Sequence, residues 1–268
     1  MIINHIRGIT EYKDMMTAEE KKKLALFLDI TGDSLRDGYK RLREAYQFSD
    51  DEIPPSSGEP EDPYLNGFPE EADTLEIVAG RIRLCTACAL HRTRTQTVPG
   101  EGVNRPLVLV VGEGPGADED LTGRPFVGKA GQLLDRMLAS IGLFRNKNCF
   151  IANVVKCRPP NNREPLPEEA AACALFLTRQ ISILKPRVIL SAGRTAVQTL
   201  LETAASLGSL RGHFTEYKGI PLLPTYHPSA LLRDESKKRP AWEDLKVLRV
   251  KLSELDQAYA REAAERNP

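Results

Sequence analysis

The sequence predicts a three-layer α/β/α fold with a mainly parallel central sheet. Short apolar segments that end in glycine or small residues are typical of buried parallel strands, and segments with helical periodicity alternate with them. That alternation places helices on both faces of one sheet. We expect strands at residues 107–112, 149–155, 187–192 and 220–223, and helices at 129–141, 168–184, 194–201 and 242–260.

The chain divides into three predicted parts. Residues 1–49 form a helical N-terminal extension, with one helix opening at Thr17 and a second running to about Gln47. Residues 50–73 are acidic and rich in Pro, Gly and Ser, a composition that predicts a flexible linker. Residues 74–268 carry the strand and helix pattern and are the predicted globular domain.

The formal net charge of zero conceals an asymmetry. Residues 1–73 contain 9 Lys and Arg against 17 Asp and Glu, whereas the rest contains 28 against 20. A basic body of net charge +8 suits a polyanionic ligand. No segment approaches the roughly 18 apolar residues that span a bilayer, and no signal peptide is apparent at the amino terminus. We therefore expect a cytoplasmic protein with no membrane partner.

Four of the five cysteines have a spacing that suits a metal centre. Cys85 and Cys88 form a C-x2-C pair, and Cys157 and Cys173 follow. Four thiolates bind either Zn²⁺ or a [4Fe–4S] cluster, and this spacing does not choose between them. The alternative is a set of small buried apolar residues. Cys149 lies within an apolar strand, so we interpret it as a core residue.

Unusual segments follow three of the expected strands: GEGPG at 112–116, NVVKCRPP at 153–160 and YHPSALLR at 226–233. Because ligands of such sheets bind beyond the carboxyl ends of the strands, one site at that edge is expected. The segment from Gly123 to Ala130 nearly matches a P-loop. Ala130 replaces the required hydroxyl residue, and a polar loop at 117–122, instead of a buried strand, precedes the segment, so we interpret the match as accidental.

The motifs GEGPGADED (112–120), TGRPFVGKAGQLL (122–134), NVVKCRPP (153–160) and HPSALLR (227–233) resemble those of family 4 uracil-DNA glycosylases, the iron–sulfur type of bacteria and archaea. The resemblance covers roughly residues 74–256. It implies a monofunctional enzyme of base excision repair that flips uracil out of DNA and hydrolyses its N-glycosidic bond. It also implies a [4Fe–4S] cluster held by Cys85, Cys88, Cys157 and Cys173. The alternative is a non-catalytic iron–sulfur DNA-binding module that retains the fold.

The resemblance further implies roles for residues around the uracil. Phe126 stacks on the base, and Asn153 distinguishes uracil from cytosine. His227 contacts uracil O2, where negative charge develops, and Glu113 either positions water or offsets positive charge on the sugar. The backbone of Gly114 and Pro115 lines the O2 side. Taken singly, Phe126 also fits core packing, while Asn153 and His227 also fit turns.

Three more residues receive roles from the resemblance. Glu119 excludes the methyl group of thymine, Leu231 enters the duplex as a wedge, and Arg233 contacts the DNA backbone. The expected partner is uracil-containing DNA, bound by a monomer. Residues 1–49 offer a possible surface for a protein partner.

Overall fold

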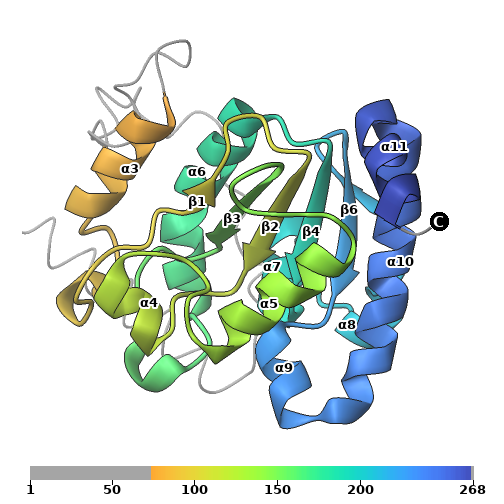
Figure 1. Cartoon of the computed structure of the whole chain (residues 1–268). Coiled ribbons are helices and arrows are strands. Elements are labelled where there is room, and N and C mark those ends of the chain that lie inside the picture. The colour runs from red at the N-terminus through yellow and green to blue at the C-terminus, as the bar shows by residue number, and fades with distance from the viewer. Residues whose placement is uncertain (1–73, 267–268) are drawn as a thin grey trace, which may run out of the picture. The chain divides into compact units, whose positions relative to one another are not determined.

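A computed structural model describes residues 74–266, and a six-stranded sheet lies at the centre of this part of the chain (Figure 1). The strand order is β1-β3-β2-β4-β6-β5. The four inner strands are parallel, and the short edge strands β1 and β5 pair antiparallel. The strands are β1 Glu101–Gly102, β2 Val108–Gly112, β3 Cys149–Asn153, β4 Val188–Ala192, β5 Thr215–Tyr217 and β6 Ile220–Thr225. The predicted α/β fold with a mainly parallel sheet is confirmed.

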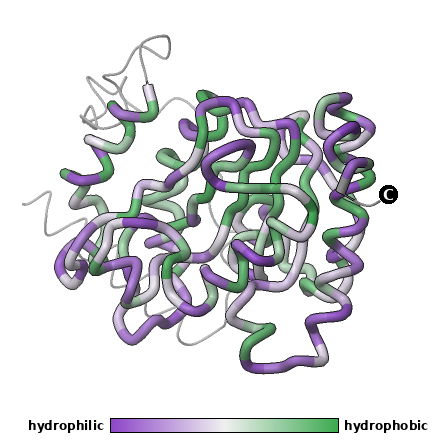
Figure 2. The backbone as a smooth tube through the Cα atoms, viewed as in Figure 1, coloured by the Kyte–Doolittle hydropathy of each residue, from purple (hydrophilic) through white to green (hydrophobic). Residues whose placement is uncertain are grey.

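The inner strands are buried on both sides, which explains their continuous apolar sequence. Every residue of β2, β3 and β4 is buried, and Figure 2 shows this region in the hydrophobic colour. Because successive side chains point to opposite faces, each strand contributes to two cores. One core joins the sheet to α5, α10 and α11, and the other joins it to α6 and α7. The result is the predicted three-layer arrangement.

The helices largely follow the predicted ranges, with two corrections. Residues 117–122, which we expected to be a polar loop, form α4, and the last predicted helix breaks at Asp256 into α10 and α11. The described helices are α3 Leu75–Leu84, α4 Ala117–Thr122, α5 Lys129–Ser140, α6 Pro167–Leu184, α7 Arg194–Leu201, α8 Leu207–Leu210, α9 Pro228–Arg233, α10 Lys238–Leu255 and α11 Gln257–Arg266. Short 3₁₀ turns are η2 Ala89–Arg92, η3 Pro160–Asn162 and η4 Glu235–Lys237.

The predicted N-terminal helices and the acidic linker lie outside the described residues. The segment that resembles a P-loop joins α4 to α5 and follows a helix instead of a strand, so its context is not that of a phosphate-binding loop. Among the described helices, none has the length and apolarity to cross a membrane.

A buried ion pair fixes the end of β6, where the chain approaches His227. The carboxylate of Asp244, on α10, accepts hydrogen bonds from Arg211 Nη2 at 2.6 Å and from Thr225 Oγ1 at 2.7 Å. Asp244 is fully buried. Truncating one partner of such a pair leaves an uncompensated charge, so this contact ties α10 firmly to the strand end.

Candidate active site

The carboxyl ends of β2 and β3 bring three predicted site residues together. Gly112 is the register partner of Asn153. A Cβ atom at Gly112 would lie 2.5 Å from both Asn153 Oδ1 and Phe126 Cζ, so only glycine leaves room for these two side chains. The ring of Phe126 in turn lies 5.5 Å from that of His227, centroid to centroid. Residues from all four motifs therefore meet at one point, as the sequence predicted.

Asn153 holds an unused hydrogen-bond acceptor at this point. The residue is 1% exposed, and its Oδ1 has no hydrogen-bond partner among the described residues. A buried polar atom without a partner costs about 1–3 kcal/mol, so such atoms in native proteins call for an explanation. A ligand that carries an N–H donor would satisfy it.

The hydrogen bonds of His227 define its protonation. The backbone amide of Ser229 donates to Nδ1 at 3.2 Å, and the Ser229 hydroxyl lies 2.8 Å from the same nitrogen. Burial, helped by the positive charge of Arg233, lowers the pKa of His227 to about 4. The imidazole is therefore neutral near pH 7 with its proton on Nε2, which makes Nε2 a hydrogen-bond donor.

Glu113 directly follows β2 and is held by a residue of α7. Its Oε2 accepts a hydrogen bond from Thr195 Oγ1 at 2.6 Å. Burial raises the pKa of the Glu113 carboxyl, while Thr195 and the nearby Arg194 and Arg233 act in the opposite direction. A carboxyl group whose pKa is raised in this way suits acid–base chemistry or electrostatic stabilisation.

The loop after β2 is fastened to the loop that carries Phe126. Glu119 Oε2 accepts from the Gly116 amide at 3.1 Å, and Oε1 accepts from the amides of Val127 at 2.8 Å and Gly128 at 2.9 Å. Both carboxylate oxygens therefore stabilise the loops, a contact that the sequence analysis missed. The exclusion of thymine by Glu119 stays a prediction.

The backbone of Gly114 and Pro115 runs beside the same site. A Cβ atom at Gly114 would lie 2.8 Å from Val155 Cγ2, so the loop packs closely on the segment after β3. Pro115 is buried. The predicted contact of these two residues with uracil O2 stays a prediction.

Leu231, the predicted wedge, is buried in this structure, and its role in DNA stays a prediction. Leu231 is only 2% exposed, whereas the next residue, Leu232, is 47% exposed. Both belong to α9, which packs against α5, and consecutive residues of a helix point about 100° apart. The side chain four residues after His227 therefore faces the protein, and Leu232 and the exposed Arg233 face solvent.

The four predicted cysteine ligands line one hollow. Cys85 ends α3, Cys88 precedes η2, Cys157 follows β3 and Cys173 lies on α6, and all four contribute to its wall. Cys149 is buried in β3, apart from this set. Within the described part of the chain, no group of three His, Cys, Asp or Glu side chains is placed to hold a single metal ion.

The surroundings of the cysteines suit an anionic centre. Arg94 Nη1 donates to Cys157 Sγ at 3.2 Å and to the Cys85 carbonyl at 2.8 Å. Burial raises the pKa of the Cys88 and Cys157 thiols, and raises that of Cys173 to about 12. These thiols are protonated without a metal, so a bound centre must displace their protons and supply the positive charge.

A buried lysine connects the cysteine hollow with the site around Asn153. Lys156 is 1% exposed, and its Nζ donates to the Asn153 carbonyl at 2.8 Å and to Gln180 Oε1 at 2.7 Å. The same side chain lines the cysteine hollow. The sequence analysis missed this residue, although a lysine between Val155 and Cys157 in an apolar segment is a usable signal. No comparable feature of the sequence points to Thr195, the residue that donates to Glu113.

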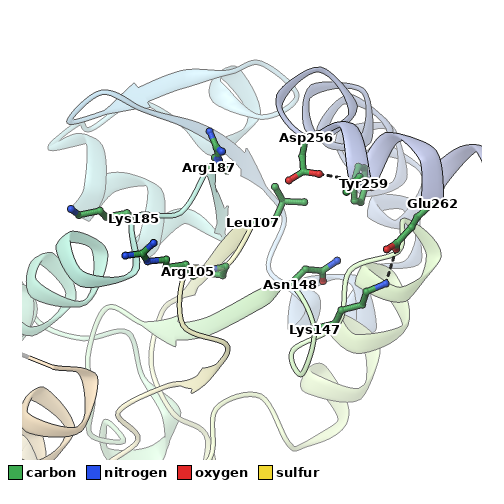
Figure 3. A pocket seen from close by; sticks show the side chains of 11 residues that line it. Arg105, Leu107, Lys147, Asn148, Lys185, Arg187, Asp256, Tyr259 and Glu262 are labelled. Atoms are coloured by element: carbon green, nitrogen blue, oxygen red, sulfur yellow. Dashed lines mark hydrogen bonds and ion pairs between the residues drawn. The ribbon is translucent and has the colours of Figure 1, made fainter.

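A cavity of about 630 Å³ lies at the opposite edge of the sheet (Figure 3). It is lined by residues that precede β2, β3 and β4, among them Leu107, Asn148 and Arg187. Lys147 and Glu262 form an ion pair of 2.6 Å on its wall. Since ligands of parallel sheets bind at the carboxyl ends of the strands, this cavity lies at the wrong edge for the active site.

Comparison with known proteins agrees with this geometry. Residues 99–246 match the model of the uracil DNA glycosylase superfamily. A type-4 uracil-DNA glycosylase of Thermotoga maritima is 48% identical over 177 residues, which cover 65% of this chain and 92% of the relative. That of Saccharolobus solfataricus is 39% identical over 189 residues, covering 68% and 88%. The matched region contains the segments that meet around Asn153, and the chain belongs to the type-4 uracil-DNA glycosylases of that superfamily.

Proposed function

We propose that this protein is a monofunctional uracil-DNA glycosylase, which hydrolyses the N-glycosidic bond of uracil in DNA and leaves an abasic site. The unpartnered Asn153 Oδ1 carries the proposal, because uracil N3–H is a donor of the kind that this buried acceptor lacks. Uracil O4 accepts from the same carboxamide. Cytosine has an unprotonated N3 and an amino group, so it would leave buried polar atoms unpaired.

The neighbouring residues supply the rest of the chemistry. Phe126 stacks on the extruded base, and the Nε2–H of His227 donates to uracil O2. When the bond between C1′ and N1 breaks, its electron pair leaves with the uracil, so this donor stabilises the developing anion. Water then adds to C1′, and the proton that it loses neutralises the released uracil anion. We propose that the Glu113 carboxylate positions this water or offsets the positive charge on the sugar.

Substitution of Asn153 by Asp tests the recognition of uracil. The carboxylate cannot donate to O4, and we expect single-turnover uracil release to fall by at least about 100-fold while binding of abasic DNA persists. Release is measured on a U·G duplex and on a single-stranded oligonucleotide, with thymine as the negative substrate. The exposed Asn104, substituted in the same way, is the matched control.

Retention of the wild-type rate by Asn153→Asp would contradict the assignment of this residue. If the wild-type protein itself gave no multiple-turnover release, the alternative of a non-catalytic DNA-binding module would replace the proposed function.

The pH dependence of the reaction reports on Glu113. Because its pKa is raised above the ordinary 4.5, the carboxylate is lost as the pH falls through that raised value, and kcat/KM should decline on the acid side. His227, with a pKa of about 4, is still neutral there and does not cause the decline. Glu113→Gln should be slower and should lack this acid limb. If kcat/KM of the Glu113→Gln variant declined at acid pH as it does in the wild type, another group would be responsible for the decline.

We propose Leu232, in place of Leu231, as the side chain that fills the space left by the flipped nucleotide. An exposed apolar side chain beside Arg233 suits insertion into a duplex. Leu232→Ala should slow release from duplex DNA about tenfold more than release from a single strand. Leu231→Ala is the paired variant and should mainly lower the free energy of unfolding, by about 2–5 kcal/mol. A reversal of these two effects would restore Leu231 as the wedge.

We also propose that Cys85, Cys88, Cys157 and Cys173 hold a [4Fe–4S] cluster, because these four thiols line one hollow and such clusters are held by four cysteine thiolates. A bound cluster would tie the segment around Cys85 to α6, and hydrolysis would need no redox step from it. Cys88→Ala should lose the iron found in the isolated protein, whereas Cys149→Ala should keep it. Iron-free wild-type protein would overturn this proposal and leave the glycosylase proposal standing.

The remaining expectations concern location and assembly. We propose a cytoplasmic monomer whose N-terminal residues 1–49 are available to a protein partner. The basic balance of residues 74–268, set against the acidic residues 1–73, supports DNA binding by the globular domain alone. A molecular mass in solution of twice the chain mass would contradict the monomer.

A further inference from the structure

Arg145 contacts the loop that carries Phe126 from a position outside the site. It lies in the turn before β3, 15% exposed. Its Nη1 donates to the carbonyl of Pro125 at 2.8 Å, and its Nη2 donates to the carbonyl of Phe126 at 2.9 Å. One guanidinium therefore holds two consecutive carbonyls of this loop.

The backbone of Phe126 needs such a support. Its φ of +53° lies in the left-handed region, which non-glycine residues seldom occupy. A conformation of this kind persists where the surrounding contacts determine it, and it is common at ligand sites. A Cβ atom at Gly131 would lie 1.9 Å from the Phe126 carbonyl oxygen, so α5 begins in direct contact with the same peptide.

The guanidinium is itself oriented by acidic residues. Asp135 Oδ1, on α5, accepts from Arg145 Nε at 3.0 Å and from Nη2 at 2.8 Å. Glu101 Oε2, on β1, lies 3.6 Å from Nη1. All three guanidinium nitrogens are thus engaged. A lysine has one ammonium group on a flexible stem and cannot reproduce this planar set of contacts.

We infer that Arg145 is a positioning residue for uracil recognition, which holds the Phe126 ring in the orientation that stacks on the flipped base. This inference rests on the proposed function. The contacts of Arg145 go to the backbone of Pro125 and Phe126 and to two carboxylates. Its effect on catalysis must therefore pass through Phe126.

The test is a double-mutant cycle between Arg145→Lys and Phe126→Ala. The cycle compares the inhibition constant for free uracil and the KM and kcat for a uracil oligonucleotide. Alone, Arg145→Lys should weaken inhibition by uracil and raise KM by about tenfold, in the range expected for a lost base–aromatic contact. In the Phe126→Ala background the same change should have less than about a twofold effect.

Arg124 provides a matched control, because it pairs with the same carboxylate, Glu101, as Arg145 does. Arg124 pairs with Glu101 at 2.8 Å but is 60% exposed, and its guanidinium hydrogen-bonds to Glu101 and not to the Phe126 peptide. Arg124→Lys should leave uracil inhibition within about twofold of the wild type. Should Arg145→Lys fail to fold, Asp135→Asn loosens the same guanidinium and should change uracil inhibition in the same direction.

Two results would overturn the inference. One is uracil inhibition by Arg145→Lys within about twofold of the wild type, and the other is a full multiplicative effect in the Phe126→Ala background. The second result would mean that Arg145 supports the fold independently of Phe126. Absence of uracil release by the wild type, measured first on the same substrates, would instead refute the proposed function on which the inference rests.

Discussion

The site depends on the parallel pairing of β2 with β3, which places Gly112 beside Asn153. Both strands are fully buried, so neither can shift by one residue without turning its apolar side chains toward the wrong face. The register therefore fixes Asn153 at the edge of the sheet. The missing side chain at Gly112 then lets the Asn153 carboxamide and the Phe126 ring approach the same backbone.

Around this fixed pair, loops are held by charged side chains bound to backbone groups. Glu119 accepts three amide hydrogen bonds that join the loop after β2 to the loop of Phe126, and Arg145 donates to two carbonyls of the latter. Charge-assisted hydrogen bonds of this kind are stronger than neutral ones. The recognition surface thus has a rigid support before any base enters, and little ordering is left to be done on binding.

The cysteine hollow and the recognition site share one short segment of chain. Between Asn153 at the end of β3 and Cys157, the buried Lys156 bonds to the Asn153 carbonyl and to Gln180 on α6. A centre bound by the four cysteines would restrain this segment at one end while the sheet restrains it at the other. A group without a role in hydrolysis would in this way be physically linked to the segment that carries Asn153.

The sequence by itself determined the four parallel strands of the sheet and the convergence of the segments that carry Asn153 and His227, because apolar strands and the motifs at their ends are local patterns. The edge strands β1 and β5 were not predicted, and Phe126 joined the site through the family resemblance. The sequence also determined the four cysteines as a set. Only the tertiary structure decided the orientation of individual side chains. In the folded protein Leu231 points inward and Leu232 points outward, and the Glu119 carboxylate accepts hydrogen bonds from backbone amides. Arg145 and Thr195 bind Phe126 and Glu113, which lie far from them in the sequence. Such contacts depend on how elements pack, and packing joins residues that no local pattern connects.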